Sequence, residues 1–308
     1  ETAPLAHDVE VVGAMQAEIW LSADAPDTDL WVKVLDVASA TPLADEVKWV
    51  KFSELAWAKD GSGFYYSRFP EPAAAGTFQS LNQDQSIYFH KLGTAQSADR
   101  LVFATPKRPD LNNSAKLSDD GKWLIVTSSS GTDDRYEITL IDVTRRNSKP
   151  RVLIPGFKHN YTFVGNRGST FYFITNQGAP KLKVVSIDVA STSASPRTII
   201  AEDAATLEDA SIVGGKLIVS YLADAKSEVR VHGLDGRREG SVDLPGIGSA
   251  AGFSGDDDDP ETFFYFTSFN RPTAIYRYDA RSGRVGIWAE PKVDFNPDDY
   301  SVEQRFFA

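Results

Sequence analysis

The chain of 308 residues contains no cysteine. This absence excludes disulfide bonds, thiolate metal sites and a cysteine nucleophile. It leaves the cellular compartment open, because a cysteine-free protein is compatible with both oxidising and reducing surroundings.

The chain also lacks an excess of positive charge and long apolar runs. Its net charge of −11 argues against nucleic acid as a partner, since phosphate binding requires clustered Lys and Arg. No apolar run approaches the ~18 residues that span a bilayer, so we predict a soluble protein with no membrane partner. Residues 1–5 (ETAPL) lack the basic and then apolar pattern of a signal peptide, so such a peptide was either never made or has been removed.

Long helical patterns are missing as well. An α/β enzyme domain would show helices of at least about ten residues between apolar strands, and no such alternation is visible. The aromatic residues, 11% of the chain and mostly Phe and Tyr, favour strands. The composition therefore predicts an all-β fold without a second, α/β catalytic domain.

What the chain does contain is a repeated unit, which residues 47–70 (VKWVKFSELAWAKDGSGFYYSRFP) show well. Asp60 and Gly61 separate an apolar approach from an aromatic strand at 64–69. Asp-Gly between apolar runs is a strong hairpin signal, because Gly adopts positive φ without steric cost. Similar units recur at intervals of roughly 45 to 60 residues, which is the spacing of propeller blades.

The cleanest copy covers residues 115–154, with four strands joined by polar turns, which is one blade. Counting from Ala17 we find six units, and the first is partly degenerate. We therefore predict a β-propeller of four-stranded antiparallel blades, forming a single domain over residues 1–308. The later units begin at residues 47, 115, 161, 210 and 250.

Two connecting segments stand outside the repeat. Residues 70–84 are rich in Ala, Gly, Pro and Gln and predict a long loop, which in compact domains is often functional. Residues 302–307 form another strand-like run. Because domains rarely stop inside an apolar strand, we expect that the chain is cut from a longer protein.

Several short motifs closely resemble the propeller of prolyl oligopeptidases, from about residue 41 to the end, and the likeness is greatest to bacterial members. They are residues 49–53 (WVKFS), 55–61 (LAWAKDG), 64–70 (FYYSRFP), 92–94 (LGT) with Gln96 and Ser97, 117–121 (LSDDG), 266–269 (FTSF) and 299–300 (DY). The resemblance implies a seven-bladed propeller that caps an α/β-hydrolase domain with a Ser-Asp-His triad that cuts after proline. The propeller's channel and its seam with the hydrolase would admit only short peptides. In family order the hydrolase domain would resume just past Phe307, so it is absent from this chain.

The first 37 residues resemble a different group. Residues 10–13 (EVVG), 22–29 (SADAPDTD) and 32–37 (VKVLDV) are similar to the C-terminal β-sandwich of X-Pro dipeptidyl-peptidase and cocaine-esterase-type hydrolases. This resemblance implies that residues 1–40 are an atypical first blade of different origin, and that the chain is a natural or engineered chimera. The resembled propeller has a further blade ahead of Ala17, for which there is no room here. The number of blades and the closure of the ring therefore stay open.

Catalytic motifs are hard to find. An α/β-hydrolase would present G-x-S-x-G, and residues 61–63 (GSG) and 248–252 (GSAAG) are only near-misses at turn or strand-start positions. Two of the four histidines lie in predicted strands, where we expect outward or half-buried rings, and none has a triad context. The histidines are His7, His90, His159 and His232. We predict no catalytic residue, and this chain alone is not expected to be an enzyme.

Candidate binding residues are equally few. The run Asp256, Asp257, Asp258 and Asp259 could attract Ca²⁺, but it occupies a turn and lacks the spacing of a calcium loop, which favours a solvated turn. The same holds for three acidic residues of the first unit, so we predict no metal and no cofactor. They are Asp24, Asp27 and Asp29. Four arginines are candidates to line the channel or face a partner domain, and they are Arg68, Arg135, Arg271 and Arg277.

The functional hypothesis is a non-catalytic propeller that limits by size the access of peptides to a hydrolase domain. Its partners would be that domain and short proline-containing peptides. A free-standing propeller used as a binding or scaffold module, and a recombined or designed propeller, are the alternatives. A closed ring predicts a monomer, and an open ring predicts oligomers because unpaired strand edges associate. Bacterial cytoplasm and periplasm are both open as locations.

Overall fold

A computed structural model describes residues 35–36, 41–42, 47–71, 82–145, 147–191 and 194–306. Its regular structure is almost entirely strand, arranged as five four-stranded sheets and one two-stranded pair. Only two short 3-10 segments, η1 (Gln96–Ala98) and η2 (Pro297–Asp299), occur in these residues. The prediction of an all-β propeller fold built from four-stranded antiparallel blades is confirmed.

Each four-stranded sheet is one blade, and its strands pair in sequence order with antiparallel neighbours. Blades I and II consist of β3 (Ala56–Trp57), β4 (Gly63–Arg68), β5 (Ser86–Lys91) and β6 (Arg100–Phe103), then β7 (Leu111–Leu117), β8 (Trp123–Ser130), β9 (Glu137–Asp142) and β10 (Arg151–Ile154). Blade III consists of β11 (Tyr161–Arg167), β12 (Thr170–Thr175), β13 (Lys183–Asp188) and β14 (Arg197–Ile200). Blade IV consists of β15 (Thr206–Val213), β16 (Lys216–Ala223), β17 (Lys226–Gly233) and β18 (Arg238–Ser241). Blade V consists of β19 (Ser249–Ser254), β20 (Glu261–Thr267), β21 (Ala274–Asp279) and β22 (Arg284–Ala289).

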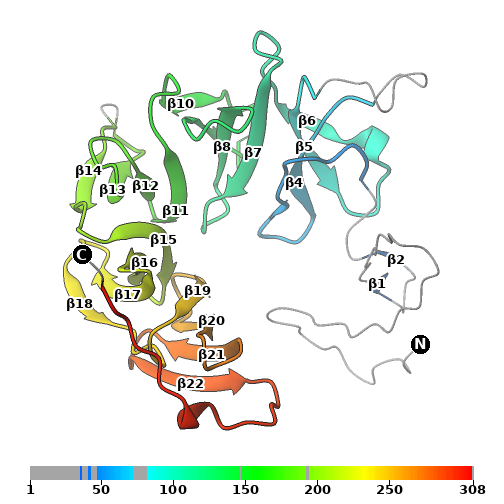
Figure 1. The fold of residues 1–308 in the computed structure, drawn as a ribbon. Helices are drawn as coiled ribbons and strands as arrows, with labels where there is room; N and C mark the ends of the chain where they lie inside the picture. The colour runs from blue at the N-terminus through cyan, green and yellow to red at the C-terminus, as the bar shows by residue number, and fades with distance from the viewer. Residues whose placement is uncertain are drawn as a thin grey trace.

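The five blades follow one another along an arc, with the first strand of each blade toward the centre and the last strand at the periphery (Figure 1). Neighbouring inner strands contact each other, as β11 does with β15 and β15 with β19. The arc therefore arranges the inner strands side by side as the wall of a central channel.

The hairpin between the first two strands has the same local chemistry in blades I and II. Gly61 has φ of +69°, and the Ser62 amide donates to Asp60 Oδ1 at 3.0 Å. In blade II the Lys122 amide donates to Asp120 Oδ1 at the same distance, and Gly121 has φ of +71°. The Asp-Gly signal in the sequence thus forms the turn by the mechanism expected of it.

Apolar side chains gather between the blades. Four buried clusters lie at the four seams between consecutive blades. At the seam between blades IV and V, Phe264 of β20 belongs to one buried cluster with Ile218 of blade IV. Within blade V, the Phe264 ring stacks on Phe253 at 4.6 Å. The recurring aromatic residues of the second strand therefore hold the blades together, which leaves the polar inner strands for the channel.

Units two to six of the predicted repeat correspond to blades I to V. The first unit lies largely outside the described residues, which include only β1 (Leu35–Asp36) paired with β2 (Thr41–Pro42). The count of six units and the atypical blade over residues 1–40 therefore stay predictions. The strand predicted at 302–307 is wrong for its described part, because residues 301–306 are not in a strand and run across turns instead.

One side of blade V is left open by the described residues. Tyr265 is 43% exposed, Ile275 36% and Trp288 62%, although all three lie on strands of an apolar sheet. Whether the ring closes over this side, and the state of association that depends on it, stay predictions. No helix in the described ranges is long and apolar enough to cross a membrane.

Candidate functional site

The channel has two chemically different ends. We call the end formed by the turns between the first and second strands of each blade the inner-turn end. The turns between the second and third strands lie at the opposite end, and residues 296–306 cross two of them. We call this opposite end the tail end.

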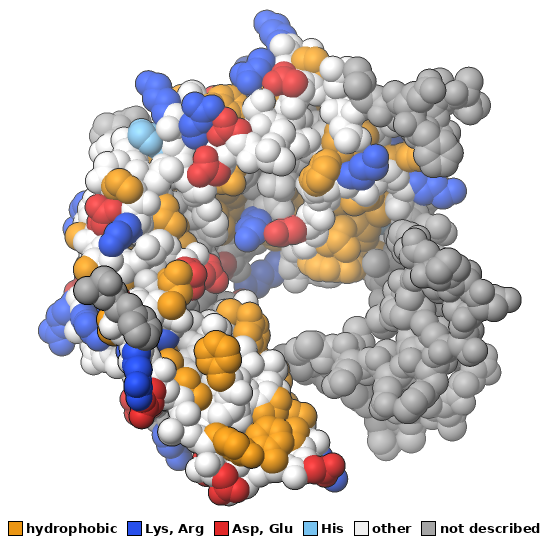
Figure 2. All heavy atoms as spheres, in the orientation of Figure 1, with side chains coloured by type: hydrophobic (Ala, Val, Ile, Leu, Met, Phe, Trp, Pro, Cys, Tyr) orange, Lys and Arg blue, Asp and Glu red, His pale blue; other side chains and the backbone are white. Residues whose placement is uncertain are grey.

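The wall between the two ends carries charged and polar side chains of the inner strands. Lys116 of β7 lies 3.8 Å from Glu54 (Nζ to Oε2). Asp209 on β15 is exposed to solvent, but partial desolvation by the surrounding protein still raises the pKa of its carboxyl. Lys116, Asp209 and Thr162 of β11 line one cavity of about 220 Å³. Figure 2 shows a hollow beside the described blades, with basic and acidic side chains on the blades' side of it.

A larger cavity, of about 570 Å³, lies between blades II and III and extends to Phe52 and Glu54, which precede the first strand of blade I. Tyr136, Tyr161 and Phe163 supply aromatic walls, and Asn112 and Ser129 supply polar groups. The strand ends that line it place it toward the tail end. Aromatic walls with a few polar groups suit an organic ligand such as a peptide segment.

Buried hydrogen bonds join blades I and II at the tail end. The Asn113 side chain is fully buried, and its Nδ2 donates to the carbonyl of Gln85 at 2.8 Å. Its Oδ1 accepts from the Ser128 hydroxyl at 2.7 Å. The backbone amide of Asn113 in turn donates to Gln85 Oε1 at 2.6 Å. This neutral network leaves few buried polar groups unpaired, so the seam is rigid.

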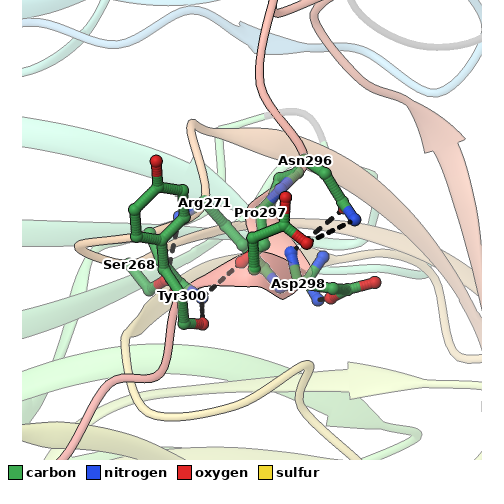
Figure 3. A network of polar contacts seen from close by, with 8 residues as sticks. Ser268, Arg271, Asn296, Pro297, Asp298 and Tyr300 are labelled. Atoms are coloured by element: carbon green, nitrogen blue, oxygen red, sulfur yellow. Dashed lines mark hydrogen bonds and ion pairs between the residues drawn. The ribbon is translucent and has the colours of Figure 1, made fainter.

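Residues 296–306, which we call the tail, are held by Asn270 and Arg271 of the β20–β21 turn, and we call this contact the clamp (Figure 3). Asn270 Nδ2 donates to the carbonyl of Pro297 at 3.1 Å and to that of Tyr300 at 2.9 Å. Arg271 pairs with Asp298. The 3-10 turn itself is capped by Asn296, whose side chain accepts from the Asp298 amide at 3.2 Å. The clamp determines the path by which the chain leaves blade V.

Beyond the clamp the tail crosses blade IV, where the Gln304 side chain donates to the carbonyl of Asp224 in the β16–β17 turn. Exposed aromatic rings flank this path: Phe269 is fully exposed, Tyr300 is 60% exposed and Phe306 73%. These rings leave apolar area exposed to solvent at the tail end.

The inner-turn end is held by charges. Lys59 donates to the carbonyl of Asp119, and the Asp119 carboxylate accepts from the Asn166 amide at 3.1 Å. Arg167 and Asp257 form an ion pair. Burial raises the pKa of Asp119, and the carboxylates at 256 and 257 raise it further. Turns of blades I, II, III and V together line a cavity of about 210 Å³.

The histidines do not gather in this channel. His90 is completely buried, with Nδ1 2.7 Å from Asp99 Oδ1, so the expected outward or half-buried ring is wrong. His90 is buried because η1 brings Asp99 back against the end of β5. The Tyr66 hydroxyl donates a hydrogen bond to the same Asp99 carboxylate. His232 is buried too, and burial with the nearby Arg238 lowers its pKa. His159 is partly exposed before β11, and His7 lies outside the described residues.

The acidic run 256–259 forms the β19–β20 turn. Asp257 binds Arg167, and Asp259 Oδ1 accepts from the Glu261 amide at 2.9 Å. In the part of the chain that the structure describes, no three His, Asp or Glu side chains are placed to hold a metal ion. The other acidic candidates, Asp24, Asp27 and Asp29, lie outside it. The absence of catalytic, metal and cofactor residues stays a prediction.

The four candidate arginines have separate places. Arg135 pairs with Asp133 in an exposed turn, and Arg277 pairs with Glu261. Arg271 belongs to the tail clamp. Arg68 lies over the Tyr88 ring at 4.1 Å, and its Nε is buried without a hydrogen bond partner.

None of these arginines is among the channel residues Glu54, Lys116 and Asp209, which the sequence reasoning missed. The available signal was the alternation of polar and apolar residues in the first strand of each unit. In β7, for example, Ala115 is buried and Lys116 is exposed. Polar residues at alternate positions of a first strand therefore indicate the channel wall.

Comparison with known proteins agrees with this architecture. The chain matches the family of prolyl oligopeptidase N-terminal beta-propeller domains over residues 24–291. It is 30% identical over 281 residues to the prolyl endopeptidase of Elizabethkingia meningoseptica, covering 90% of this chain and 39% of that protein. The match begins inside the segment that resembles the β-sandwich hydrolases, and the chimera stays a prediction.

Solved structures show the same likeness. A prolyl endopeptidase analysed for inter-domain dynamics superposes with a TM-score of 0.79 at 40% identity, covering 87% of this chain and 38% of that one. Prolyl oligopeptidase B of Galerina marginata, bound to a 25-residue macrocyclization substrate, gives 0.76 at 26% identity, covering 86% and 38%. The chain spans about two fifths of the length of these relatives. It belongs to the prolyl oligopeptidase family and represents the N-terminal β-propeller domain of that family.

Proposed function

We propose that this propeller limits, by size, the peptides that reach a hydrolase domain of the prolyl oligopeptidase type. The observation that carries the proposal is the match of residues 24–291 to a domain that is N-terminal in this family. The substrates of that enzyme would be short proline-containing peptides, and the hydrolase domain would be the partner.

The hydrolase is expected to dock on the tail end. Residues 296–306 lie across this end, and the clamp at Asn270 and Arg271 directs them there. The exposed rings of Phe269 and Phe306 flank the same path and offer apolar area for burial. A domain connected through these residues begins over the mouth of the channel.

The channel then controls access by its width and its lining. Inner strands of neighbouring blades stand side by side, and aromatic seams keep them from moving apart. A short peptide can enter such a passage whole and follow its polar wall. A folded protein cannot, and neither can a long unfolded chain, whose radius of gyration is about 30 Å at 100 residues. Large substrates are excluded by geometry, without binding energy spent on rejecting them.

The proposal is tested by joining the chain, through its C-terminus, to the hydrolase domain of the Elizabethkingia relative. We expect the joined protein to cleave a short proline-containing peptide while sparing an unfolded proline-containing chain of about 100 residues. The isolated hydrolase domain serves as the control and should cleave both. Equal cleavage of the long chain by the joined and the isolated hydrolase would contradict the size filter.

The docking face is tested by a matched pair of variants in the joined protein. Phe269→Ser removes a fully exposed ring at the tail end, and Trp288→Ser removes a 62% exposed ring from the open side of blade V. We expect the first variant alone to weaken size selection, because only Phe269 lies on the proposed interface. The reverse result would place the hydrolase elsewhere.

A further inference from the structure

An ion pair at the inner-turn end joins two blades that are not neighbours. Arg167, at the end of β11 in blade III, binds Asp257, in the β19–β20 turn of blade V. The contact is bidentate, with Nε to Oδ2 at 2.9 Å and a terminal guanidinium nitrogen to Oδ1 at 2.6 Å. Because β15 lies between β11 and β19, the pair passes over the first turn of blade IV.

The turn of blade IV leaves room for this passage. It consists of Gly214 and Gly215, with φ of +54° and +81°. A Cβ atom on Gly215 would lie 3.0 Å from the Arg167 guanidinium, and one on Gly214 would lie 2.7 Å from Pro260 Cα. Side chains on this turn would therefore obstruct both the arginine and the turn of blade V.

The pair is also tied to blades I and II. The Asn166 amide, one residue before Arg167, donates to the Asp119 carboxylate at 3.1 Å. Asp119 in turn accepts through its carbonyl from Lys59 of blade I. The turns of four blades thus converge on one cavity of about 210 Å³, and Arg167 and Asp257 both line it.

We propose that the Arg167–Asp257 pair is a latch that holds the inner-turn end of the channel narrow. The apolar packing of propeller blades is between neighbours, so small tilts at successive seams add up and widen one end. A link from blade III to blade V restrains the two seams of blade IV at once. The planar guanidinium and carboxylate also set the angle of approach, which a single hydrogen bond would not.

The latch can open because it is reachable by water. The Arg167 side chain is 53% exposed and that of Asp257 25%, so salt screens the attraction between them. Its consequence for substrates rests on the proposed function: a latched end excludes solutes that an unlatched end admits. The inner-turn end is then the adjustable opening of the size filter.

The absence of cysteine allows a direct test by electron paramagnetic resonance. Ser169→Cys in blade III and Asp258→Cys in blade V place spin labels on exposed positions of the two turns. We expect a narrow distance distribution in the otherwise unchanged chain. Arg167→Ala should at least double its width and shift it to longer distances. An unchanged distribution would overturn the latch.

Two controls separate the latch from a general loosening. Arg277→Ala removes an ion pair with Glu261, which lies within blade V, and should leave the distribution narrow. Arg167→Asp combined with Asp257→Arg reverses the pair and should restore the narrow distribution that either single variant loses. A double variant as broad as the single ones would overturn the proposal. Circular dichroism checks that each variant is folded.

This measurement needs neither hydrolase nor peptide. A size filter that fails in the joined enzyme therefore leaves the latch standing, and an unchanged label distance overturns the latch while leaving the size filter intact.

Discussion

The two ends of the channel are held by different forces. At the tail end, the fully buried neutral side chain of Asn113 donates across the first seam to the Gln85 carbonyl at 2.8 Å, and the Asn270 amide holds residues 296–306. At the inner-turn end, exposed or half-buried charged side chains such as Arg167 and Asp257 connect the blades through ion pairs. Buried networks are costly to break, whereas exposed ion pairs contribute little and depend on salt. The difference assigns rigidity to the tail end and adjustability to the inner-turn end.

The largest effect is expected at the buried network of the tail end. Asn113→Ala leaves the Gln85 carbonyl and the Ser128 hydroxyl without partners in a site closed to water. The free energy of unfolding should fall by about 2–3 kcal/mol, as measured by urea denaturation. Asn112→Ala, one residue earlier on the exposed face, should change it by less than about 0.5 kcal/mol. An equal loss of unfolding free energy in both variants would contradict the claim that the buried hydrogen bonds of Asn113 stabilise the tail end.

The next effect concerns the clamp. Asn270→Asp keeps the size of the side chain but removes the donor that binds the carbonyls of Pro297 and Tyr300. If the substitution removes about 1.4 kcal/mol of the free energy that holds the tail on the turn, the tail detaches about tenfold more often. Trypsin should then cleave after Arg305 about tenfold faster. Cleavage after Arg281, in the exposed β21–β22 turn, is the internal control and should not change. Parallel increases at both sites would indicate global unfolding and refute the clamp.

A smaller effect is expected from pH at the inner-turn end. Burial, with the neighbouring Asp256 and Asp257, raises the pKa of Asp119 in the folded state. As pH rises, the Asp119 carboxyl of the unfolded chain therefore loses its proton at a lower pH than that of the folded chain. The folded state is favoured below the pKa of the unfolded state, and this contribution to stability is lost as pH rises through the pKa of the folded state. Asp119→Asn keeps an acceptor for the Asn166 amide but cannot ionise, so its stability should decline less as pH rises above about 4, the ordinary pKa of an aspartate. Parallel pH profiles by urea denaturation would contradict the raised pKa.

The smallest effect on stability should come from the latch itself. Arg167→Lys keeps the charge but loses the bidentate contact with Asp257. The free energy of unfolding should fall by less than about 1 kcal/mol at low salt. The difference should vanish near 1 M NaCl, where the screening length is about 3 Å. A loss as large as that of Asn113→Ala, or one that salt does not alter, would erase the contrast between the two ends.

Sequence patterns located the blades well because their signals are local. The Asp-Gly turn at Asp60 needs only its own residues to form, and alternating apolar residues mark the buried faces of each strand. The same local reasoning failed for residues 302–307. An apolar run becomes a strand only where a partner strand is available, and here the chain passes over turns instead.

His90 shows a second kind of failure. Its strand was recognised, but its burial depends on Asp99, which lies beyond the strand and is brought back by η1. The channel residues were missed for a related reason. Lys116 and Asp209 lie 93 positions apart and line one cavity only because successive blades turn around a common centre.

The unit of residues 47–70 shows how far the sequence alone reaches. Turn chemistry, strand periodicity and family resemblance are encoded within tens of residues, and they determined the all-β class, the propeller and its family. The contact between Arg167 and Asp257 joins residues 90 positions apart, across a glycine turn that belongs to neither. Only the tertiary structure decided it, because the placement of each blade depends on the packing of all the seams between them.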